Sequence, residues 1–377
     1  RLLAHGATWG DRGVVAAAVL GSLATGALMP IMIVLFGDLM DGFQGGDPQA
    51  LIDINQTYDL GITVASTVGA QAAELEEMGY TGVMTAETAH DPFFPLLVAA
   101  QNTEKVELMT SIAVAFARSP MTLANVGHDL NAYSKGRFVL GLGSQIKPHI
   151  TKRFSMPWSS PAARMREYVM AMRAIWDSWH QQEPLAFTGQ FYTHTLMTPF
   201  FTPTNTDYGA PKVFLAAVGP MMTEVAGEVA DGVIAHAFTT EKYLRETTLP
   251  ALERGFAKAG KSRADFEISY PAFVVTGQTE EELREAEVAT CKQIAFYGST
   301  PAYRPVLESI GVGELQDELN RMSKQGRWDE MGELITPDIL KEFAVIGEPD
   351  TIAGQMKARY GDIVDRTSAA YANIPKD

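Results

Sequence analysis

The sequence predicts an α/β fold of the TIM-like (β/α)8 type, and three features of the chain lead to this prediction. From residue 58 onward, short apolar strand patterns alternate with amphipathic helical patterns. Repeated strand–helix units build a mostly parallel sheet with helices outside it, either open and doubly wound or closed as a barrel. No GxGxxG follows the first predicted strand, which disfavours the dinucleotide-binding form of the open sheet. We therefore expect the closed barrel.

The composition excludes several classes of function. The chain has 377 residues, enough for one large domain or two ordinary ones, and a formal net charge of -15. An acidic surface does not replace the counterions of nucleic acid or anionic lipid, so we expect neither as a general partner. Cys291 is the only cysteine, which excludes a disulfide framework and a cysteine-based metal site and fits a reducing cytoplasm.

The first part of the chain differs from the rest. Residues 14–36 carry no charge and are long enough to cross about 30 Å of hydrocarbon as a helix. The surrounding segment, ATWGDRGVVAAAVLGSLATGALMPIMIVLFGDLMDGF, resembles the first transmembrane helix of B-type ABC exporters. No Walker A sequence follows, so the chain does not hold a complete transporter. We interpret residues 1–54 as a fused hydrophobic fragment, with a membrane anchor through residues 14–36 and a buried core helix as the alternatives, and residues 55–377 as the barrel.

The expected elements follow from the spacing of apolar residues and from glycine and proline stops. Strands are predicted at residues 60–64, 81–86, 106–116, 138–142, 213–217, 233–235, 266–275 and 343–346. Helices are predicted at residues 69–78, 92–101, 120–134, from 159–161 onward, 221–230, 243–259, 280–294 and 349–360. The polar and aromatic stretch at 187–203 lacks a helical period and is expected to form a hairpin excursion.

The segment KVFLAAVGPMMTEVAGEVADGVIAH, residues 212–236, predicts a strand, a turn, a helix and a second strand. Gly219 allows a tight turn, and Pro220 suits the first position of a helix. The amides that follow are left unpaired at the positive end of the helix dipole, which is a common way to bind phosphate. An ordinary strand-to-helix turn would show the same pattern, so the ligand stays open at this point.

Polar residues follow the second strand, where a barrel carries its chemistry. Glu87 could hold a hydroxyl or a ring NH of a ligand, and His90 could move a proton near neutral pH. Capping of the next helix explains Asp91, which stands before Pro92, but it does not explain Glu87.

Two further segments suit a flat, anionic ligand. Residues 111–119 (SIAVAFARS) are apolar enough to face a ring, although a buried strand would look the same. Residues 141–145 (GLGSQ) indicate a tight glycine turn, followed by a basic cluster that could pair with a phosphate or a carboxylate tail or could simply be solvated. The cluster consists of Lys147, His149, Lys152 and Arg153.

Metal and nucleophile chemistry are not indicated. The seven histidines show no HExxH pattern, no GxSxG precedes a helix, and Cys291 lies in a helical pattern away from the loops. Acid, base and phosphate recognition without a nucleophile suggests a bound redox cofactor that supplies the reactivity.

Six segments, taken in order, resemble the luciferase-like monooxygenases, and within them the oxidoreductases that use the deazaflavin coenzyme F420. The segments are TAETAHDPFFPL, SIAVAFARSPMTLA, GRFVLGLGSQIKPHI, FSMPW, FLAAVGPMMTEVAGEVADGV and IAFYGSTPAYRPVL. The resemblance runs from about residue 58 to the end of the chain. It implies a TIM-like barrel with an excursion after a central helix, which suits residues 187–203.

The resemblance also implies a cofactor site. The deazaflavin ring would lie across Ala113 and Val114, where the family has a bulge with a non-prolyl cis peptide. Glu87 would contact the polar part of the ring or the ribityl chain, and Gly143 and Ser144 would line the pocket. The cofactor phosphate would be held by Val218, Gly219, Pro220 and Met221. A polyglutamate tail would be neutralised by Lys147, Lys152 or Arg153.

The implied chemistry is hydride transfer at the deazaflavin C5, with His90 as the group that moves a proton. The sequence departs from the sugar-phosphate dehydrogenases of the family, which have His where Thr88 stands and Glu after the glycine turn, where this chain has Gln145 and Ile146. Glucose 6-phosphate is therefore not the expected substrate. A late segment is expected to cover the pocket with Tyr297, Ser299, Tyr303 and Arg304.

The sequence thus predicts an F420-dependent oxidoreductase that acts on an unidentified small molecule. An FMN-dependent luciferase-like monooxygenase is the alternative enzyme. A membrane-anchored binding module or a transporter fragment is the alternative of another class. A homodimer is compatible with all three.

Overall fold

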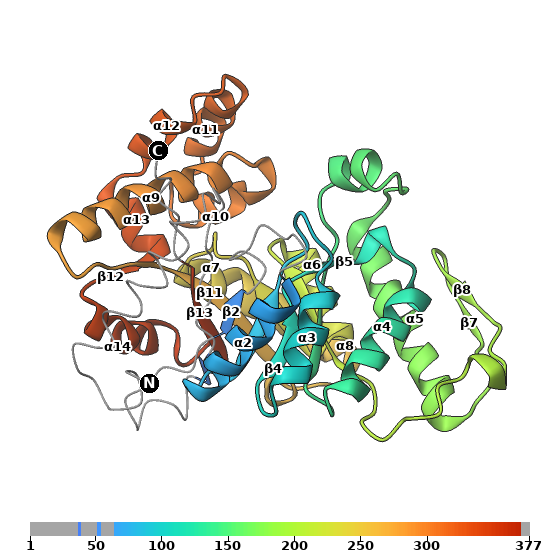
Figure 1. Cartoon of the computed structure of the whole chain (residues 1–377). Helices are drawn as coiled ribbons and strands as arrows, with labels where there is room; N and C mark the ends of the chain where they lie inside the picture. The colour runs from blue at the N-terminus through green and yellow to red at the C-terminus, as the bar shows by residue number, and fades with distance from the viewer. Residues whose placement is uncertain (1–36, 39–50, 54–63, 371–377) are drawn as a thin grey trace.

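The computed structural model describes residues 37–38, 51–53 and 64–370 of the chain (Figure 1). The uncharged stretch at residues 14–36 lies outside these residues. Within the described ranges, no helix is both long and apolar enough to cross a membrane.

Most strands of the described residues join one sheet. Its hydrogen-bonded order is β1-β13-β11-β10-β9-β6-β4-β3-β2, with β12 beside β11 and β5 beside β6. Every pairing within it is parallel except that of β1 with β13. The strands are β1 Gly37–Asp38, β2 Leu51–Asp53, β3 Gly82–Thr85, β4 Glu107–Thr110, β5 Ala113–Val114, β6 Phe138–Gly143, β9 Lys212–Ala217, β10 Gly232–Ala235, β11 Glu267–Val275, β12 Ala344–Ile346 and β13 Arg366–Ala370.

Contacts across the interior show that the sheet curves into a barrel. Arg366 of β13 pairs with Glu107 of β4, although β11, β10, β9 and β6 lie between these two strands in the sheet order. Five strands also contribute to one small apolar cluster, which contains Met84, Met109, Val139, Phe214 and Ile234. The interior is therefore a packed core, as in the predicted TIM-like (β/α)8 barrel.

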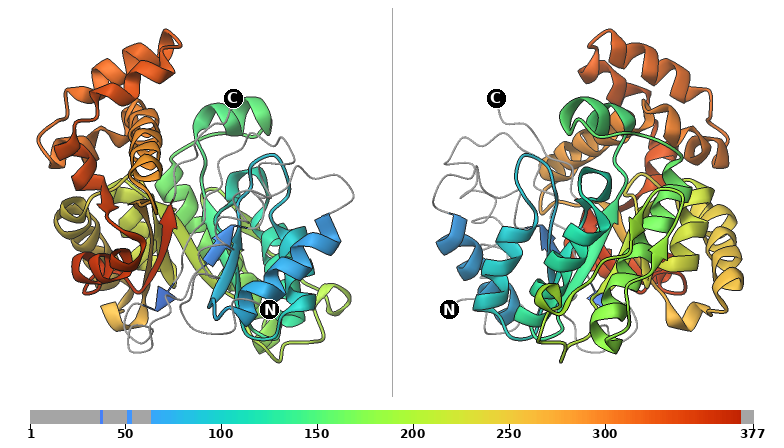
Figure 2. Two further views of the ribbon diagram at one scale, coloured as in Figure 1. Left: turned by 60° about the vertical axis from the view of Figure 1, so that its left-hand side comes forward. Right: turned by 90° about the vertical axis from the view of Figure 1, so that its right-hand side faces the viewer.

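Helices surround the strands, as Figures 1 and 2 show. One large apolar core joins the strands to helices on the outside of the sheet. Its helices are α2 Val64–Glu77, α3 Phe93–Asn102, α4 Pro120–Tyr133, α5 Pro161–Gln181, α6 Pro220–Val229, α8 Leu249–Ala259 and α14 Pro349–Tyr360. The predicted aromatic stripe of α5 is confirmed as core, because Trp176 and Trp179 are at most 2% exposed.

Two insertions extend from the barrel. The predicted excursion after α5 is confirmed as an antiparallel hairpin of β7 Phe187–Thr188 and β8 Thr193–His194. A group of helices between β11 and β12 has its own apolar core and stands above one end of the barrel in Figures 1 and 2. It contains α9 Glu280–Gly298, α10 Arg304–Ser309, α11 Leu315–Lys324, α12 Trp328–Met331 and α13 Pro337–Phe343.

The first and last strands differ from the prediction. β2, at Leu51–Asp53, pairs with β3 and lies before the predicted domain boundary at residue 55, so the sheet begins earlier than expected. The predicted strand at 60–64 is wrong at its end, because Val64 begins α2, and its other residues lie outside the described ranges. β13, at Arg366–Ala370, was not predicted because RTSAA contains no apolar β-branched residue.

Candidate active site

The turn between β9 and α6 presents unpaired amides, as the sequence predicts. Gly219 is the N-cap and Pro220 the first residue of α6, and the backbone and hydroxyl of Thr223 both donate to the Gly219 carbonyl, at 3.1 and 3.0 Å. Among the described residues, nothing accepts a hydrogen bond from the amides of Met221 and Met222. A Cβ added at Gly219 would meet no atom within 4 Å. The helix end is therefore open to an anion.

The segment after β10 holds this turn in place. The hydroxyl of Tyr243, which is 2% exposed, donates to the carbonyl of Val218 at 3.1 Å. Tyr243 ends the short helix α7 (Glu241–Tyr243), and its own amide donates to the hydroxyl of Thr240 at 3.1 Å. The capped helix therefore fixes the side chain that supports Val218.

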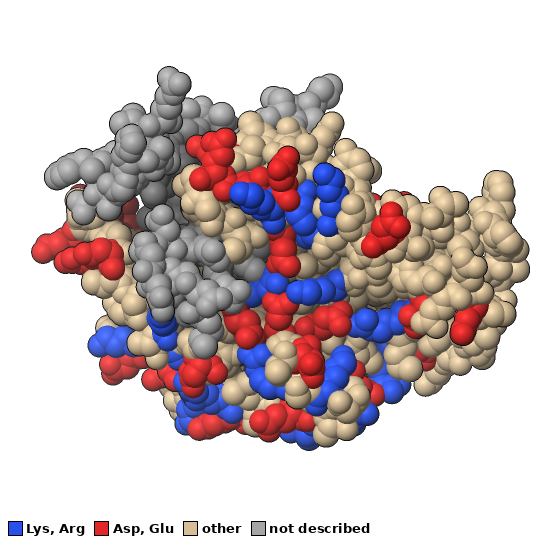
Figure 3. Space-filling model, turned by 90° about the horizontal axis from the view of Figure 1, so that it is seen from below, with Lys and Arg blue, Asp and Glu red and all other residues tan. Residues whose placement is uncertain are grey.

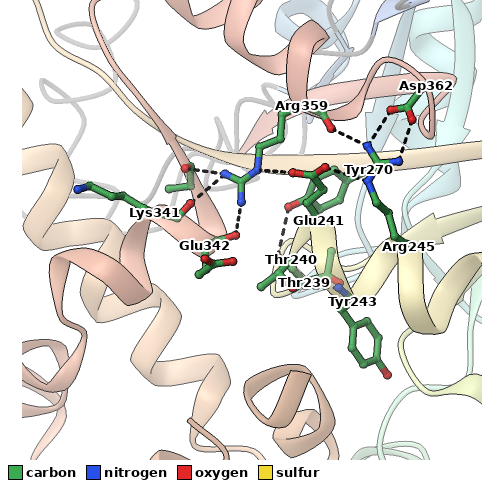
Figure 4. Close-up of polar contacts among 11 residues, drawn as sticks. Thr239, Thr240, Glu241, Tyr243, Arg245, Tyr270, Lys341, Glu342, Arg359 and Asp362 are labelled. Atoms are coloured by element: carbon green, nitrogen blue, oxygen red, sulfur yellow. Dashed lines mark hydrogen bonds and ion pairs between the residues drawn. The ribbon is translucent and has the colours of Figure 1, made fainter. Parts of the chain in front are cut away.

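A network of charged groups ties α7 to the last helix of the barrel (Figure 4). Glu241 accepts a hydrogen bond from Arg245 at 2.9 Å and pairs with Arg359 of α14 at 3.5 Å. Arg359 also donates to main-chain carbonyls in the segment 341–344, and Arg245 pairs with Asp362 at 2.8 Å. These contacts connect the end of β10 with the segments on both sides of β12.

His236 is the first residue after β10. Because Ala235 pairs with Ala217 in the neighbouring strand, His236 lies beside Val218 at the carboxyl end of the barrel. Its Nδ1 accepts a hydrogen bond from the amide of Phe238 at 3.0 Å. Burial lowers the pKa of His236 from 6.5 to about 4. The imidazole is therefore neutral at pH 7, with its proton on Nε2.

Two of the four residues expected to cover the pocket lie against this imidazole. The ring centroids of Tyr297 and Tyr303 are 4.6 and 4.9 Å from that of His236. Ser299 is buried and donates to the carbonyl of Phe296, and Arg304 pairs with Glu308 and Asp317. Tyr297 and Tyr303 thus lie at the carboxyl end of the barrel, whereas the side chains of Ser299 and Arg304 form contacts within the helical insertion. That this segment covers the pocket stays a prediction.

Glu87 holds the neighbouring strands together. Its Oε2 accepts hydrogen bonds from the amide of Val114 at 2.7 Å and from Arg118 at 2.6 Å, and its amide donates to the Ile112 carbonyl. Arg118 also pairs with Asp91 at 3.1 Å. Burial alone would lower the pKa of Arg118, but the hydrogen bond to Glu87 and the charges of Glu87 and Asp91 raise it. This carboxylate thus has a structural role that the sequence did not predict.

Ala113 and Val114, over which the ring was expected to lie, form β5 and are completely buried. They pair with Leu142 and Gly143 of β6. The expected non-prolyl cis peptide lies directly before them, at Ser111–Ile112. The half-buried residue that adjoins β5 is Ile112.

The predicted glycine turn at 141–145 is wrong in part, because its glycines belong to the strand β6. A Cβ at Gly141 would lie 1.8 Å from the Thr110 carbonyl oxygen, and one at Gly143 would lie 2.7 Å from the side chain of Ile112. The glycines therefore let the β4–β5 backbone approach β6 closely. The turn itself lies just after the end of β6, at Gln145, whose φ of 57° is in the left-handed region.

His90 is half-buried after β3, and none of the described residues hydrogen-bonds to its ring. Asp91, which precedes the N-cap Pro92, accepts a hydrogen bond from the amide of Phe93, the first residue of α3, at 2.9 Å, so its carboxylate pairs an amide at the start of this helix. His90 remains available for proton transfer, and its role stays a prediction.

The segment after β6 carries the basic cluster. Ser144 is half-buried, and its hydroxyl donates to the Gln145 carbonyl. Lys147 and Lys152 are exposed, and no described residue forms an ion pair with either. Arg153 donates to the Thr88 carbonyl and so connects this segment to the loop after β3.

The structure brings the predicted groups to one end of consecutive strands. β3, β4, β6, β9 and β10 are neighbours in the sheet, and their carboxyl ends carry Glu87, the short strand β5, Ser144, the Gly219 turn and His236. Sequence reasoning missed His236. The signal was present, because a histidine directly follows the predicted strand 233–235.

A model of the family described as luciferase-like monooxygenase matches residues 49–366. Segments before residue 49 lie outside this match, and the comparisons give no support to the exporter resemblance. An uncharacterized protein of Mycobacterium tuberculosis is 57% identical over 295 residues, which cover 78% of this chain and 87% of that protein. The 5,10-methylenetetrahydromethanopterin reductase of Archaeoglobus fulgidus is 25% identical over 74% of this chain and 81% of its own length.

Solved structures share the fold. The coenzyme F420-dependent tetrahydromethanopterin reductase from Methanopyrus kandleri superposes with a TM-score of 0.65 at 20% identity, covering 84% of this chain and 90% of that chain. The oxygenating constituent of 3,6-diketocamphane monooxygenase from Pseudomonas putida, in complex with FMN, has a TM-score of 0.55 at 16% identity, covering 81% and 86%. The family match covers most of the chain, and the barrel described above is the fold of these structures. The chain therefore belongs to the luciferase-like monooxygenase family, a family of oxidoreductases.

Proposed function

We propose that this protein is an F420-dependent oxidoreductase that exchanges a hydride with a small organic substrate at the carboxyl end of its barrel. The observation that carries the proposal is the β9–α6 turn. Its unpaired amides at Met221 and Met222 and the open space at Gly219 suit the phosphate of a large cofactor. When bound there, the deazaflavin would supply the hydride chemistry.

Both F420 and FMN carry a phosphate, so the turn alone does not separate them. The A. fulgidus relative is a methylenetetrahydromethanopterin reductase, and the M. kandleri structure is named as F420-dependent. The P. putida structure holds FMN, which keeps an oxygen-using monooxygenase as the alternative. The exposed Lys147 and Lys152 favour F420, because its polyglutamate tail is anionic and FMN has no such tail.

The contacts and burial of Glu87 and His90 suggest a role for each in the proposed reaction. Glu87 positions β5, and so the surface on which a flat ring would rest, through the Val114 amide and Arg118. His90 is proposed to move a proton between the substrate and solvent, since it is half-buried and its ring nitrogens have no described partner.

The proposal is tested by titrating the full chain with F420 and, separately, with FMN, following the quenching of tryptophan fluorescence. The full chain is needed because β1 and β2 belong to the barrel sheet. We expect F420 to bind at least about tenfold more tightly than FMN. Tighter binding of FMN would support the oxygen-using alternative, and binding of neither would overturn the proposal.

A double variant tests whether the two lysines bind the polyglutamate tail of F420. In the chain that carries both Lys147→Gln and Lys152→Gln, we expect F420 to bind several-fold more weakly and FMN to bind unchanged. Lys324→Gln, at another exposed lysine, is the matched control. Equal losses for both cofactors would remove the argument that the basic cluster selects F420.

A further inference from the structure

The aromatic surface beside His236 adjoins the proposed cofactor site. His236 lies next to Val218, whose turn is proposed to hold the cofactor phosphate, because Ala235 and Ala217 are paired neighbours in β10 and β9. Neighbouring strands are about 5 Å apart, so His236 lies close to the turn that is proposed to hold the cofactor phosphate. Helix α9 and η7 (Pro301–Tyr303) supply the two tyrosines that pack on the imidazole.

The hydrogen bonds of His236 fix which nitrogen can donate. The Phe238 amide donates to Nδ1, so the neutral ring carries its proton on Nε2. None of the described residues accepts a hydrogen bond from Nε2. The side chain is only partly buried, which leaves this N–H as a donor for a bound molecule.

Among the residues that the structure describes, no charged group faces this surface from the elements that pack on it. From α9 the group facing His236 is Tyr297, from η7 it is Tyr303, and on its own segment it is the buried Phe238. Burial is the cause of the low pKa of His236, with no contribution from a neighbouring charge, and burial also raises the pKa of Tyr303 to about 12. Arg304 pairs with Glu308 and Asp317.

We propose that His236, Tyr297 and Tyr303 form the substrate-binding surface and select an uncharged molecule with a planar, apolar body, whose carbonyl or hydroxyl oxygen accepts a hydrogen bond from His236 Nε2. This inference rests on the proposed function, since it places the substrate beside the F420 site. An anionic substrate would lose its hydration here and find no cation in return. A planar apolar body, in contrast, packs against the tyrosine rings.

The experiment uses the full chain loaded with oxidised F420, with benzaldehyde as the uncharged probe and 4-carboxybenzaldehyde as the same body with a carboxylate. Histidine side chains are labelled with ¹⁵N, and the signal of His236 is identified by its loss in His236→Gln. We expect His236 to carry its proton on Nε2 at pH 7 and its Nε2–H signal to shift when benzaldehyde is added. The carboxylated probe is expected to bind at least about tenfold more weakly.

Two variants distinguish the hydrogen bond donated by His236 Nε2 from apolar packing against its ring. His236→Leu keeps an apolar side chain without a donor, and we expect it to weaken benzaldehyde binding by about threefold to tenfold. His236→Gln places an amide donor near the position of Nε2, so binding should return toward that of the parent chain. F420 binding should stay unchanged in both.

Several results would overturn the inference. They are a proton on Nδ1, no effect of benzaldehyde on the His236 signal, equal or tighter binding of the carboxylated probe, or equal affinities in His236→Leu and His236→Gln. If F420 binds normally and any of these is observed, only this inference fails. If F420 does not bind at all, the proposed function fails with it.

Discussion

Glu87 and His236 lie at the carboxyl ends of different strands and differ in which side-chain atoms remain without a hydrogen-bond partner among the described residues. Glu87 Oε2 accepts from a backbone amide and from an arginine, and the arginine is shared with Asp91. His236 uses Nδ1 to accept from the backbone and leaves Nε2 without a described partner. At the scale of single residues, the first therefore stabilises the site, and the second is free to contact a ligand.

The partly buried imidazole of His236 makes stability depend on pH. The pKa of His236 is about 4 in the folded chain against 6.5 for an ordinary histidine. Between pH 6.5 and 4, His236 is therefore protonated in the unfolded chain but neutral in the folded chain. The free energy of unfolding is highest above pH 6.5 and falls as the pH drops toward 4. The loss reaches up to about 3 kcal/mol.

Urea unfolding at a series of pH values measures this effect. We expect the free energy of unfolding to fall more steeply with decreasing pH in the parent chain than in His236→Gln. The exposed His149→Gln is the control and should follow the parent. Parallel curves for the parent and His236→Gln would contradict the prediction.

These residues also show what the sequence reveals about a site. Glu87 was identified as a candidate because capping of the next helix could not explain it. Its role could not be predicted, because its partners, the Val114 amide and Arg118, lie 27 and 31 positions further along the chain. His236 was overlooked because a single histidine after a strand is a weak signal. Its meaning depends on Tyr297 and Tyr303, which a distant segment supplies.

At the scale of elements, the close contact between β4 and β6 depends on glycine. The Thr110 hydroxyl donates to the Gly141 carbonyl at 2.8 Å, and a Cβ at Gly141 would lie 1.8 Å from the Thr110 carbonyl oxygen. We expect Gly141→Ala to destabilise the chain by about 3 kcal/mol or more, because the strands must separate. Gly354→Ala is the control, since an added Cβ there meets no atom within 4 Å. Urea unfolding compares the two, and equal stabilities would contradict this account.

The contact between α7 and the β9–α6 turn gives a second prediction. Tyr243→Phe removes the hydrogen bond to the Val218 carbonyl and should lower the free energy of unfolding by about 1 kcal/mol. Because the turn is then less firmly held, F420 should also bind a few-fold more weakly. Tyr133→Phe, at a residue that is 51% exposed, should change neither quantity. Loss of stability with unchanged F420 affinity would mean that Tyr243 supports the fold but not the site.

Elements with strong local patterns were predictable, and those defined by distant partners were not. β9, β10 and β11 were found because each is a mainly apolar run that contains β-branched residues and ends at glycine, proline or polar residues. β13 was missed because RTSAA is polar and small, and it is a strand only because β11 pairs along its whole length. The helical insertion from α10 to α13 was missed because its helices are short and pack mainly on one another and on α9.

At the scale of the whole molecule, many charged side chains of the described residues form ion pairs. Figure 3 shows acidic and basic side chains interspersed on the face seen from below. At the amino ends of the strands, Arg366 pairs with Glu107 and Glu267, and Lys212 pairs with Glu267 at 2.7 Å. These ion pairs connect strands that are far apart in the sequence. The net charge of -15 gives no information about such pairing.

The β9–α6 turn is central to the proposed function, because it is proposed to hold the phosphate of F420. This assignment is tested by calorimetric titration of the full chain with the ribityl phosphate of the deazaflavin, which carries no polyglutamate tail, and with the same deazaflavin and ribityl chain lacking the phosphate, in the parent chain and in Gly219→Asp. An aspartate at this N-cap accepts from the free amides of α6 and keeps the helix stable, so lost binding would not reflect unfolding.

Gly354→Asp makes the same change at an exposed glycine of α14 and should leave every affinity unchanged. We expect the parent chain to bind the tail-free ribityl phosphate at least about tenfold more tightly than the phosphate-free molecule, and Gly219→Asp to lose this preference. An equal preference for the phosphate in both chains would contradict the account, because the phosphate would then be held elsewhere.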